Sequence, residues 1–156
     1  MDFEKVKDLI VNPLLDHADV MRATLAGALQ RQANIETNYR EAKLVTANTK
    51  VILDARTAEV ELELMPALAG IVDPATGKSN KDYTKRCLDS LLAEHEELQA
   101  LRTDLEEAEA REQVIGQELG HANVAVKLAS LDWQLVMAEL AIKAALLNYG
   151  SNGHGS

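Results

Sequence analysis

The sequence predicts an all-α protein built as a long antiparallel helical hairpin, or coiled coil, with a short helix at its N-terminus. Three observations lead to this fold class. Leu and Ala supply most of the apolar residues beside many Glu, Lys, Gln and Arg, a mixture that favours helix. Aromatic residues make up only 3% of the chain, too few for a fold based on strands. A heptad repeat fills the second half, and one segment rich in Pro and Gly divides the chain.

The heptad repeat of the second half predicts one helix over residues 80–148, which at 1.5 Å per residue is about 100 Å long. Two apolar rows with a spacing of seven run through it, as the two core positions of a coiled coil do. Ser79 followed by Asp82 resembles a capping box at its start. The predicted seam, for the core or for an oligomer, contains Leu91, Leu98, Leu101, Leu105, Ile115, Leu119, Val126, Trp133 and Leu140.

The first half predicts a helix over residues 13–65, preceded by a short helix over residues 3–11, because Asn12 and Pro13 suit an N-cap and a first helical position. Its early apolar stripe changes phase near residues 36–42, which predicts a stutter. The expected seam beyond the stutter contains Leu44, Asn48, Val51, Ala55, Ala58, Leu62 and Met65. Asn48 either fixes the register of helix pairing or lies at the edge of this seam.

Residues 66–79 are expected to form the turn of the hairpin, because three Pro and Gly signals and an Asp-Pro pair fall within them. A connection this short folds the two long helices back on each other. Residues 1–149 should therefore form a single elongated domain, and the Gly-rich residues 150–156 a disordered tail. A seam rich in Ala buries little surface, so we expect the hairpins to associate into an oligomeric bundle.

The charge and the targeting signals restrict the classes of partner. A formal net charge of −9 disfavours broad binding of nucleic acid and weakens attraction to anionic membranes. No run of about 18 apolar residues and no signal-peptide pattern is present, so we expect no membrane partner. The single cysteine, Cys87, fits a buried apolar position in a reducing compartment. The expected location is the cytoplasm.

No motif for catalysis, a metal or a cofactor is complete. Residues 95–96 begin a zinc-binding His-Glu-x-x-His pattern, but Gln99 stands where the second His is needed. Residues 77–79 resemble the end of a phosphate-binding loop, but Val72 occupies the position of its first Gly. The acidic run that includes Glu106, Glu107 and Glu109 suits a solvated helix face. We therefore predict a protein that is not an enzyme and has no cofactor.

A small basic cluster beside the turn is the one candidate contact for DNA or a protein partner. It consists of Lys78, Lys81, Lys85 and Arg86.

Two segments resemble the small coiled-coil, helical-hairpin proteins encoded in the early, DNA-metabolism regions of tailed phages and prophages. Residues 38–61 (NYREAKLVTANTKVILDARTAEVE) are similar to their Tyr-x-x-Ala-Lys helical stretch. Residues 77–110 (GKSNKDYTKRCLDSLLAEHEELQALRTDLEEAEA) are similar to their turn, basic cluster and long Leu/Ala/Glu helix. The resemblance implies a protein of the host cytoplasm that is encoded near recombination or replication genes. It implies no site residues.

Three functions follow as hypotheses. The first is a non-enzymatic phage accessory protein in DNA recombination or replication, which self-associates and uses the basic cluster to contact DNA or a recombination protein. The second is an inhibitor or decoy that binds a host defence or nucleic-acid-processing protein through an acidic helical face. The third is a structural coiled-coil spacer.

Overall fold

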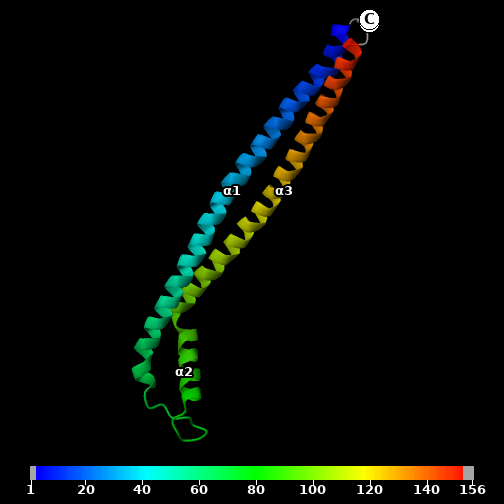
Figure 1. Ribbon diagram of the computed structural model, residues 1–156. Helices are drawn as coiled ribbons and strands as arrows, with labels where there is room; N and C mark the ends of the chain where they lie inside the picture. Colours follow the sequence, from blue (N-terminus) through cyan, green and yellow to red (C-terminus); the bar gives the residue numbers. More distant parts are fainter. Residues whose placement is uncertain (1–2, 153–156) are drawn as a thin grey trace. The chain divides into compact units, whose positions relative to one another are not determined.

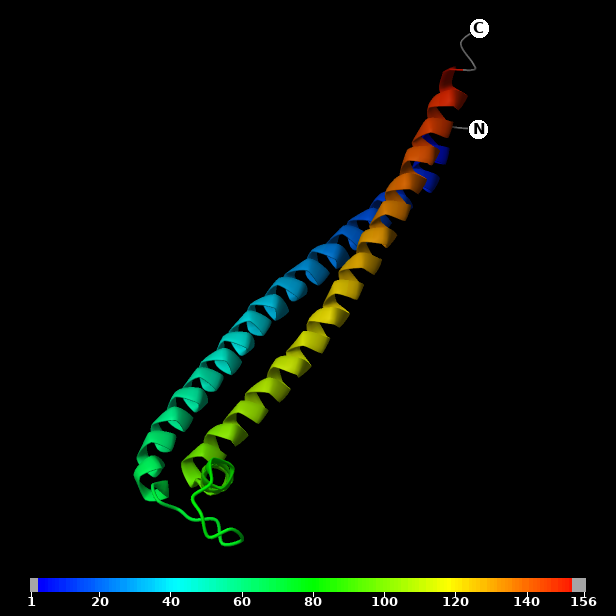
Figure 2. The same ribbon diagram turned by 60° about the horizontal axis from the view of Figure 1, so that its bottom comes forward.

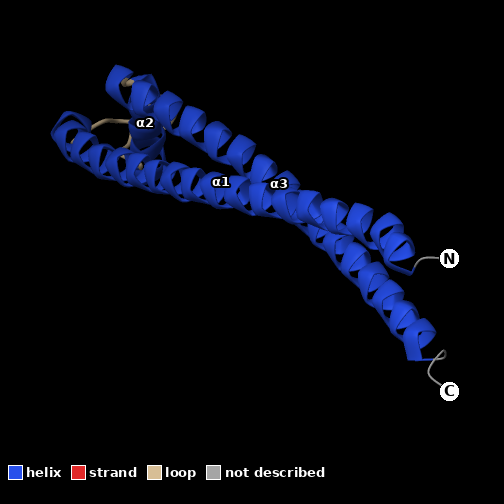
Figure 3. Ribbon diagram, turned by 90° about the horizontal axis from the view of Figure 1, so that it is seen from above, coloured by secondary structure: helices blue, strands red, loops and turns tan. Residues whose placement is uncertain are grey.

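A computed structural model describes residues 3–152, which form three helices and no strand. Helix α1 spans Phe3–Leu68, α2 spans Lys81–Glu94 and α3 spans Glu96–Asn152. The loop of residues 69–80 connects α1 to α2, and it is the tan segment beside α2 in Figure 3. Helices contain 91% of the described residues, which confirms the all-α fold class.

The chain divides into two compact units, each of which contains part of α1 and part of α3. In unit 1, residues 3–38 of α1 lie antiparallel to residues 116–152 of α3, the blue and the yellow-to-red segments of Figure 1. Unit 2 is Tyr39–Ile115, and it contains the rest of α1, the loop, all of α2 and the start of α3. Figure 2 shows the loop that connects the end of α1 to α2 in unit 2.

Unit 1 is held together by small side chains. Its buried residues are Ala18 on α1 and Ala122, Ala129 and Val136 on α3, each at most 9% exposed. Alanines at these positions let two helix backbones approach closely while burying little area per residue. Across the same pair of helices, the Gln32 side-chain amide donates to Asn123 Oδ1 at 2.6 Å. A thin apolar seam therefore joins the helices of unit 1, and the hydrogen bond between Gln32 and Asn123 adds to it.

Unit 2 has a more concentrated apolar core. Val60 of α1 is 1% exposed and packs with Leu92 of α2 and Leu98 of α3, which are 7% and 0% exposed. Leu53, Leu64, Leu88 and Leu101 pack around these three residues. The single helix predicted over residues 80–148 is wrong here, because the helix is interrupted at His95, where φ is −70° and ψ is 114°.

Packing explains the interruption. Residues six apart on one straight helix face directions about 120° apart. Leu92 and Leu98 could not both reach Val60 from an uninterrupted helix, whereas the break at His95 turns both toward it. Two hydrogen bonds support the break: Gln99 Nε2 donates to the Ala93 carbonyl at 2.9 Å, and the backbone N–H of Gln99 donates to the His95 carbonyl at 2.9 Å. His95 Nδ1 itself is buried and has no hydrogen-bond partner among the described residues.

Helix α1 is continuous, so the separate helices predicted over residues 3–11 and 13–65 are wrong. Pro13 lies on the exposed side, where its missing N–H removes one backbone hydrogen bond without disturbing the packed side. Val11, Leu14 and Ala18 on either side of it keep the three–four spacing of one seam and are at least partly buried. Burial of this seam across Pro13 keeps the helix intact.

The seam of α1 also differs from the prediction, because it keeps one phase and has no stutter. The expected residues Leu44, Val51, Leu62 and Met65 are 55–74% exposed, and Asn48, Ala55 and Ala58 are exposed as well. The observed seam of buried and half-buried residues consists of Val11, Leu14, Ala18, Met21, Leu25, Ala28, Gln32, Ile35, Tyr39, Ala42, Thr46, Thr49, Leu53, Arg56 and Val60.

Polar side chains at four seam positions hide this pattern in the sequence. Thr46 donates to the Ala42 carbonyl at 3.1 Å and Thr49 to the Val45 carbonyl at 2.9 Å. Gln32 bonds to α3 as described above, and Arg56 binds carboxylates. Because each polar group has a partner, the seam can contain it at little cost.

The loop begins and ends slightly later than the predicted turn of residues 66–79. Asp73 organises it: its carbonyl accepts from the amides of Thr76 at 3.2 Å and Gly77 at 2.8 Å, and its Oδ1 accepts from the Ala75 amide at 2.9 Å. Gly77 has a φ of +64°, in the left-handed region that side chains disfavour. At the other end of the chain, α3 includes residues 150–152 of the predicted tail, and residues 153–156 lie outside the described part.

Candidate functional site

The basic tip, which we define as Lys78, Lys81, Lys85 and Arg86, lies in unit 2. Lys78 is in the loop and the other three residues are in the first two turns of α2; all four are exposed. The predicted capping box at Ser79 is displaced by one residue. Asn80 is the N-cap, and its side-chain oxygen accepts from the Asp82 amide at 2.9 Å. This cap and the Asp73 turn fix where α2 begins and therefore where its lysines lie.

Two of the four basic residues meet at a surface hollow of ≈ 260 Å³. Lys81 and Lys85 are four residues apart, so both lie on one side of α2. Met65 of α1 and Leu88 of α2 contribute apolar surface to the same hollow. Its lining residues are Met65, Ser79, Lys81, Thr84, Lys85 and Leu88. The hollow thus combines apolar side chains with two cations. Such a lining suits a ligand in which an acidic group is attached to an apolar one.

Arg86 lies one residue farther along α2, about 100° around the helix from Lys85. Its guanidinium sits over the Tyr83 ring at 5.9 Å, a cation–π arrangement, and its Nε donates to the Asp82 carbonyl at 3.4 Å. A hydrogen bond with the Cys87 thiol raises the pKa of the Tyr83 phenol. Neither Arg86 nor Lys78 lines the hollow, and the structure therefore groups Lys81 with Lys85 alone.

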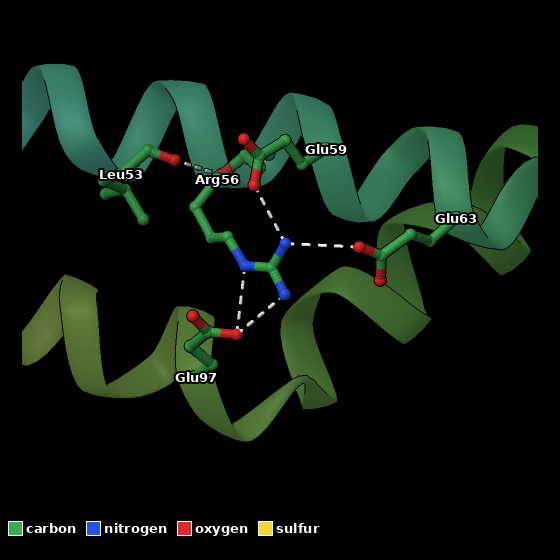
Figure 4. A network of polar contacts seen from close by, with 6 residues as sticks. Leu53, Arg56, Glu59, Glu63 and Glu97 are labelled. Atoms are coloured by element: carbon green, nitrogen blue, oxygen red, sulfur yellow. Dashed lines mark hydrogen bonds and ion pairs between the residues drawn. The ribbon is translucent and has the colours of Figure 1, made fainter.

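Unit 2 also contains an ion-pair network between α1 and the start of α3, which the sequence did not suggest (Figure 4). Arg56 of α1 binds Glu97 of α3 with its Nε and one terminal nitrogen, each at 3.0 Å from Oε2. It also binds Glu59 at 2.9 Å and Glu63 at 3.2 Å on its own helix. One guanidinium thus bridges α1 to the first turn of α3, directly after the interruption at His95. No spacing rule pairs residues 56 and 97, so only the folded chain reveals the network.

The network makes the stability of unit 2 depend on pH. Hydrogen bonding to Arg56 lowers the pKa of Glu97, and the three carboxylates raise the pKa of Arg56. A carboxyl group whose pKa is lower in the folded state stabilises the fold above its unfolded pKa, near 4.5 for Glu97. This contribution is lost as the pH falls from there through the folded pKa.

Arg56→Gln is therefore expected to lower the unfolding midpoint at pH 7, because it removes the bridge and leaves three carboxylates together without a cation. The difference between wild type and variant should shrink as the pH falls from 7 to about 3, because protonation of Glu97 weakens its bond to Arg56. Thermal unfolding followed by circular dichroism at both pH values measures this. Arg111→Gln is the matched control, since Arg111 is exposed on α3 of the same unit. A difference between wild type and Arg56→Gln that is the same at both pH values would contradict the assignment.

The predicted seam of α3 divides at His95. Leu98 is fully buried, and Leu101, Leu105, Ile115, Leu119, Val126, Trp133 and Leu140 are half-buried along the side of α3 that packs on α1. Leu91 is a correction to the predicted core: it is 40% exposed, because α2 buries Leu92 instead.

Unit 1 contains a second hollow, of ≈ 300 Å³, between its two helices. Arg31 and Ile35 of α1 and Glu118, His121, Ala122 and Ala125 of α3 line it. Among the residues whose side chains the structure describes, no group of three or more His, Cys, Asp or Glu side chains could hold a metal ion. None of the helices in residues 3–152 is long and apolar enough to cross a bilayer.

Comparisons of the chain with models of protein families, with curated proteins and with solved structures give no match.

Proposed function

We propose that this chain is a non-enzymatic helical binding protein that self-associates and holds an acidic partner at its basic tip. The observation that carries the proposal is that Lys81 and Lys85 line one hollow together with the apolar side chains of Met65 and Leu88. Two ammonium groups on one side of a capped helix attract an anionic surface, and the apolar side chains add contact area. The non-enzymatic part of the proposal comes from the sequence, where no catalytic pairing of a nucleophile with a base and no phosphate-binding loop is complete.

DNA is the first candidate for the acidic partner. The resemblance to phage hairpin proteins suggests a role in recombination or replication in the cytoplasm of a host bacterium. A chain with a net charge of −9 repels DNA everywhere except at a local basic site, so the contact would be short and sensitive to salt. The second candidate is an acidic segment of a recombination or replication protein, which is negatively charged as DNA is.

The double variant Lys81→Glu, Lys85→Glu is expected to weaken binding at the tip at least tenfold. The probes are short labelled single- and double-stranded DNA, titrated at low salt and followed by fluorescence anisotropy. Lys43→Glu, Lys50→Glu is the matched control: both lysines are exposed on α1 of unit 2, and the change in net charge is the same. If the two double variants weaken binding equally, the effect comes from net charge and the tip is not the site. If wild type binds neither DNA, the DNA proposal fails.

The two alternative functions, an inhibitor or decoy and a structural spacer, would not use the basic tip. An inhibitor or decoy would use exposed carboxylates of α3, such as Glu106, Glu107 and Glu109. Glu97 of the same acidic run already binds Arg56, which reduces the charge that this face offers. A spacer would need neither surface, and its function would depend on helix length alone.

A further inference from the structure

The outer side of α3 in unit 1 contains a second heptad repeat, separate from the seam that packs on α1. Its residues follow one another at alternating spacings of four and three, and all are exposed. We call this set the outer seam: Val124, Leu128, Leu131, Leu135, Ala138, Ile142, Ala145 and Tyr149. It occupies the two heptad positions on the side of α3 opposite the seam that packs on α1. Residues 124–149 are 26 residues, so the outer seam is about 39 Å long.

The outer seam is a local feature and does not merely reflect the apolar composition of the chain. The equivalent outward positions of α1 in unit 1 are Pro13, Asp16, Val20, Ala23, Gly27, Gln30, Asn34 and Thr37. Val20 is the one large apolar residue among these eight positions, whereas the outer seam of α3 contains six large apolar or aromatic residues and no charged residue. A stripe with a period of 3.5 residues fits another helix of the same kind, because that period keeps both helices in contact along their length.

The exposed area suits association of two chains. Val124, Leu128, Leu131, Leu135, Ile142 and Tyr149 are 54–85% exposed. Side chains of this size leave on the order of 100 Å² each, or roughly 600 Å² together, which approaches the ~800 Å² per partner of a standard interface. Leu146, 66% exposed beside the seam, adds to this surface.

The charges beside the seam favour one orientation. In a parallel pair, Lys127 of one copy lies opposite Asp132 of the other, an attractive contact that occurs twice. In an antiparallel pair, Asp132 lies opposite Glu139 of the other copy, and two like charges meet twice. Lys127, Asp132 and Glu139 are all exposed. Glu139 already pairs with Lys143 of its own helix at 2.8 Å, so the attraction between Lys127 and Asp132 contributes more to the preference than the repulsion at Glu139 does.

We propose that the outer seam is the surface on which a second copy of this chain docks, as a parallel, in-register helix pair between the two α3 helices. This inference rests on the self-association in the proposed function and names the surface responsible for it. It is independent of the basic tip, which lies in unit 2.

The first test measures the mass of the full chain by light scattering over a range of concentrations. Wild type is expected to be a dimer, and Leu128→Lys, Leu135→Lys should weaken dimerisation at least 100-fold. The matched control is Val20→Lys, Leu29→Lys, which adds the same charge at apolar residues of α1 in unit 1 that are 57% and 46% exposed. Circular dichroism confirms that both variants keep their helix content.

The second test reports the orientation. In a Cys87→Ser background, Leu131→Cys places one thiol on the outer seam, opposite its own copy in a parallel in-register pair. Oxidation should link the chains into a covalent dimer, whereas Val20→Cys on the outward side of α1 should give none. An antiparallel pair would instead bring residue 131 opposite residue 142, and no link would form, which overturns the parallel arrangement.

The outcomes separate this inference from the proposed function. A monomeric wild-type chain at about 100 µM overturns both self-association and the outer seam, while binding at the tip is judged by the DNA titration. A dimer that survives Leu128→Lys, Leu135→Lys leaves self-association standing and overturns the outer seam as its surface.

Discussion

Replacing Leu98 with alanine is expected to lower the free energy of unfolding by about 2–5 kcal/mol, the usual cost of deleting a fully buried leucine side chain. Leu98 is 0% exposed and packs with Val60 and Leu92 at the centre of unit 2. The deletion removes apolar burial and leaves a space that three helices would have to collapse to fill. Urea unfolding followed by circular dichroism measures the loss.

Leu91→Ala is the matched control, because an uninterrupted heptad would place Leu91 and Leu98 in the same core row. Leu91 is 40% exposed in the interrupted arrangement, so its deletion should cost about 1 kcal/mol or less. Equal losses for the two variants would mean that the helix continues through His95 and that the observed packing around Val60 is wrong.

Replacing Ala129 with leucine is expected to destabilise unit 1 by about 1–3 kcal/mol, because extra methylene groups must be forced between closely packed helices. Ala129 is 9% exposed, and Ala122 and Ala18 are equally small neighbours in the same seam. Since leucine and alanine differ little in helix propensity, the loss reports packing rather than helix formation.

The control for this variant is Ala23→Leu on the exposed side of α1 in the same unit. It adds the same methylene groups facing solvent, so the free energy of unfolding should change by no more than about 0.5 kcal/mol. If Ala129→Leu instead raised the stability, the seam at this position would contain unfilled space, contrary to the burial of Ala129.

The sequence by itself determined the all-α class, the position of the loop and the inner rows of α3 from Leu98 to Leu140. These features depend on local information. Large apolar residues recur in these rows every three or four positions. Gly70 and Gly77 adopt a positive φ that other residues disfavour, and Pro74 between them cannot continue a helix.

The sequence showed the four basic residues of the tip as one cluster, but it did not show that only Lys81 and Lys85 line the same hollow. Lys81 and Lys85 of α2 line a hollow to which α1 contributes Met65. Arg86 lies on another side of α2, over the Tyr83 ring. Contacts between α1 and α2 decide this, and they join residues far apart in the chain.

Only the tertiary structure decided which side of α1 is packed, where the helix after the loop is interrupted and which apolar stripes remain exposed. Gln32, Thr46, Thr49 and Arg56 occupy seam positions, and Leu44, Val51 and Leu62 face solvent. Apolar periodicity alone favours the second set. The first set is half-buried in the seam, where its polar groups find partners. The same side of α1 contains Val60, which packs with Leu92 and Leu98 from both sides of the His95 break. Such partners lie up to 91 residues away in the chain, beyond any local pattern.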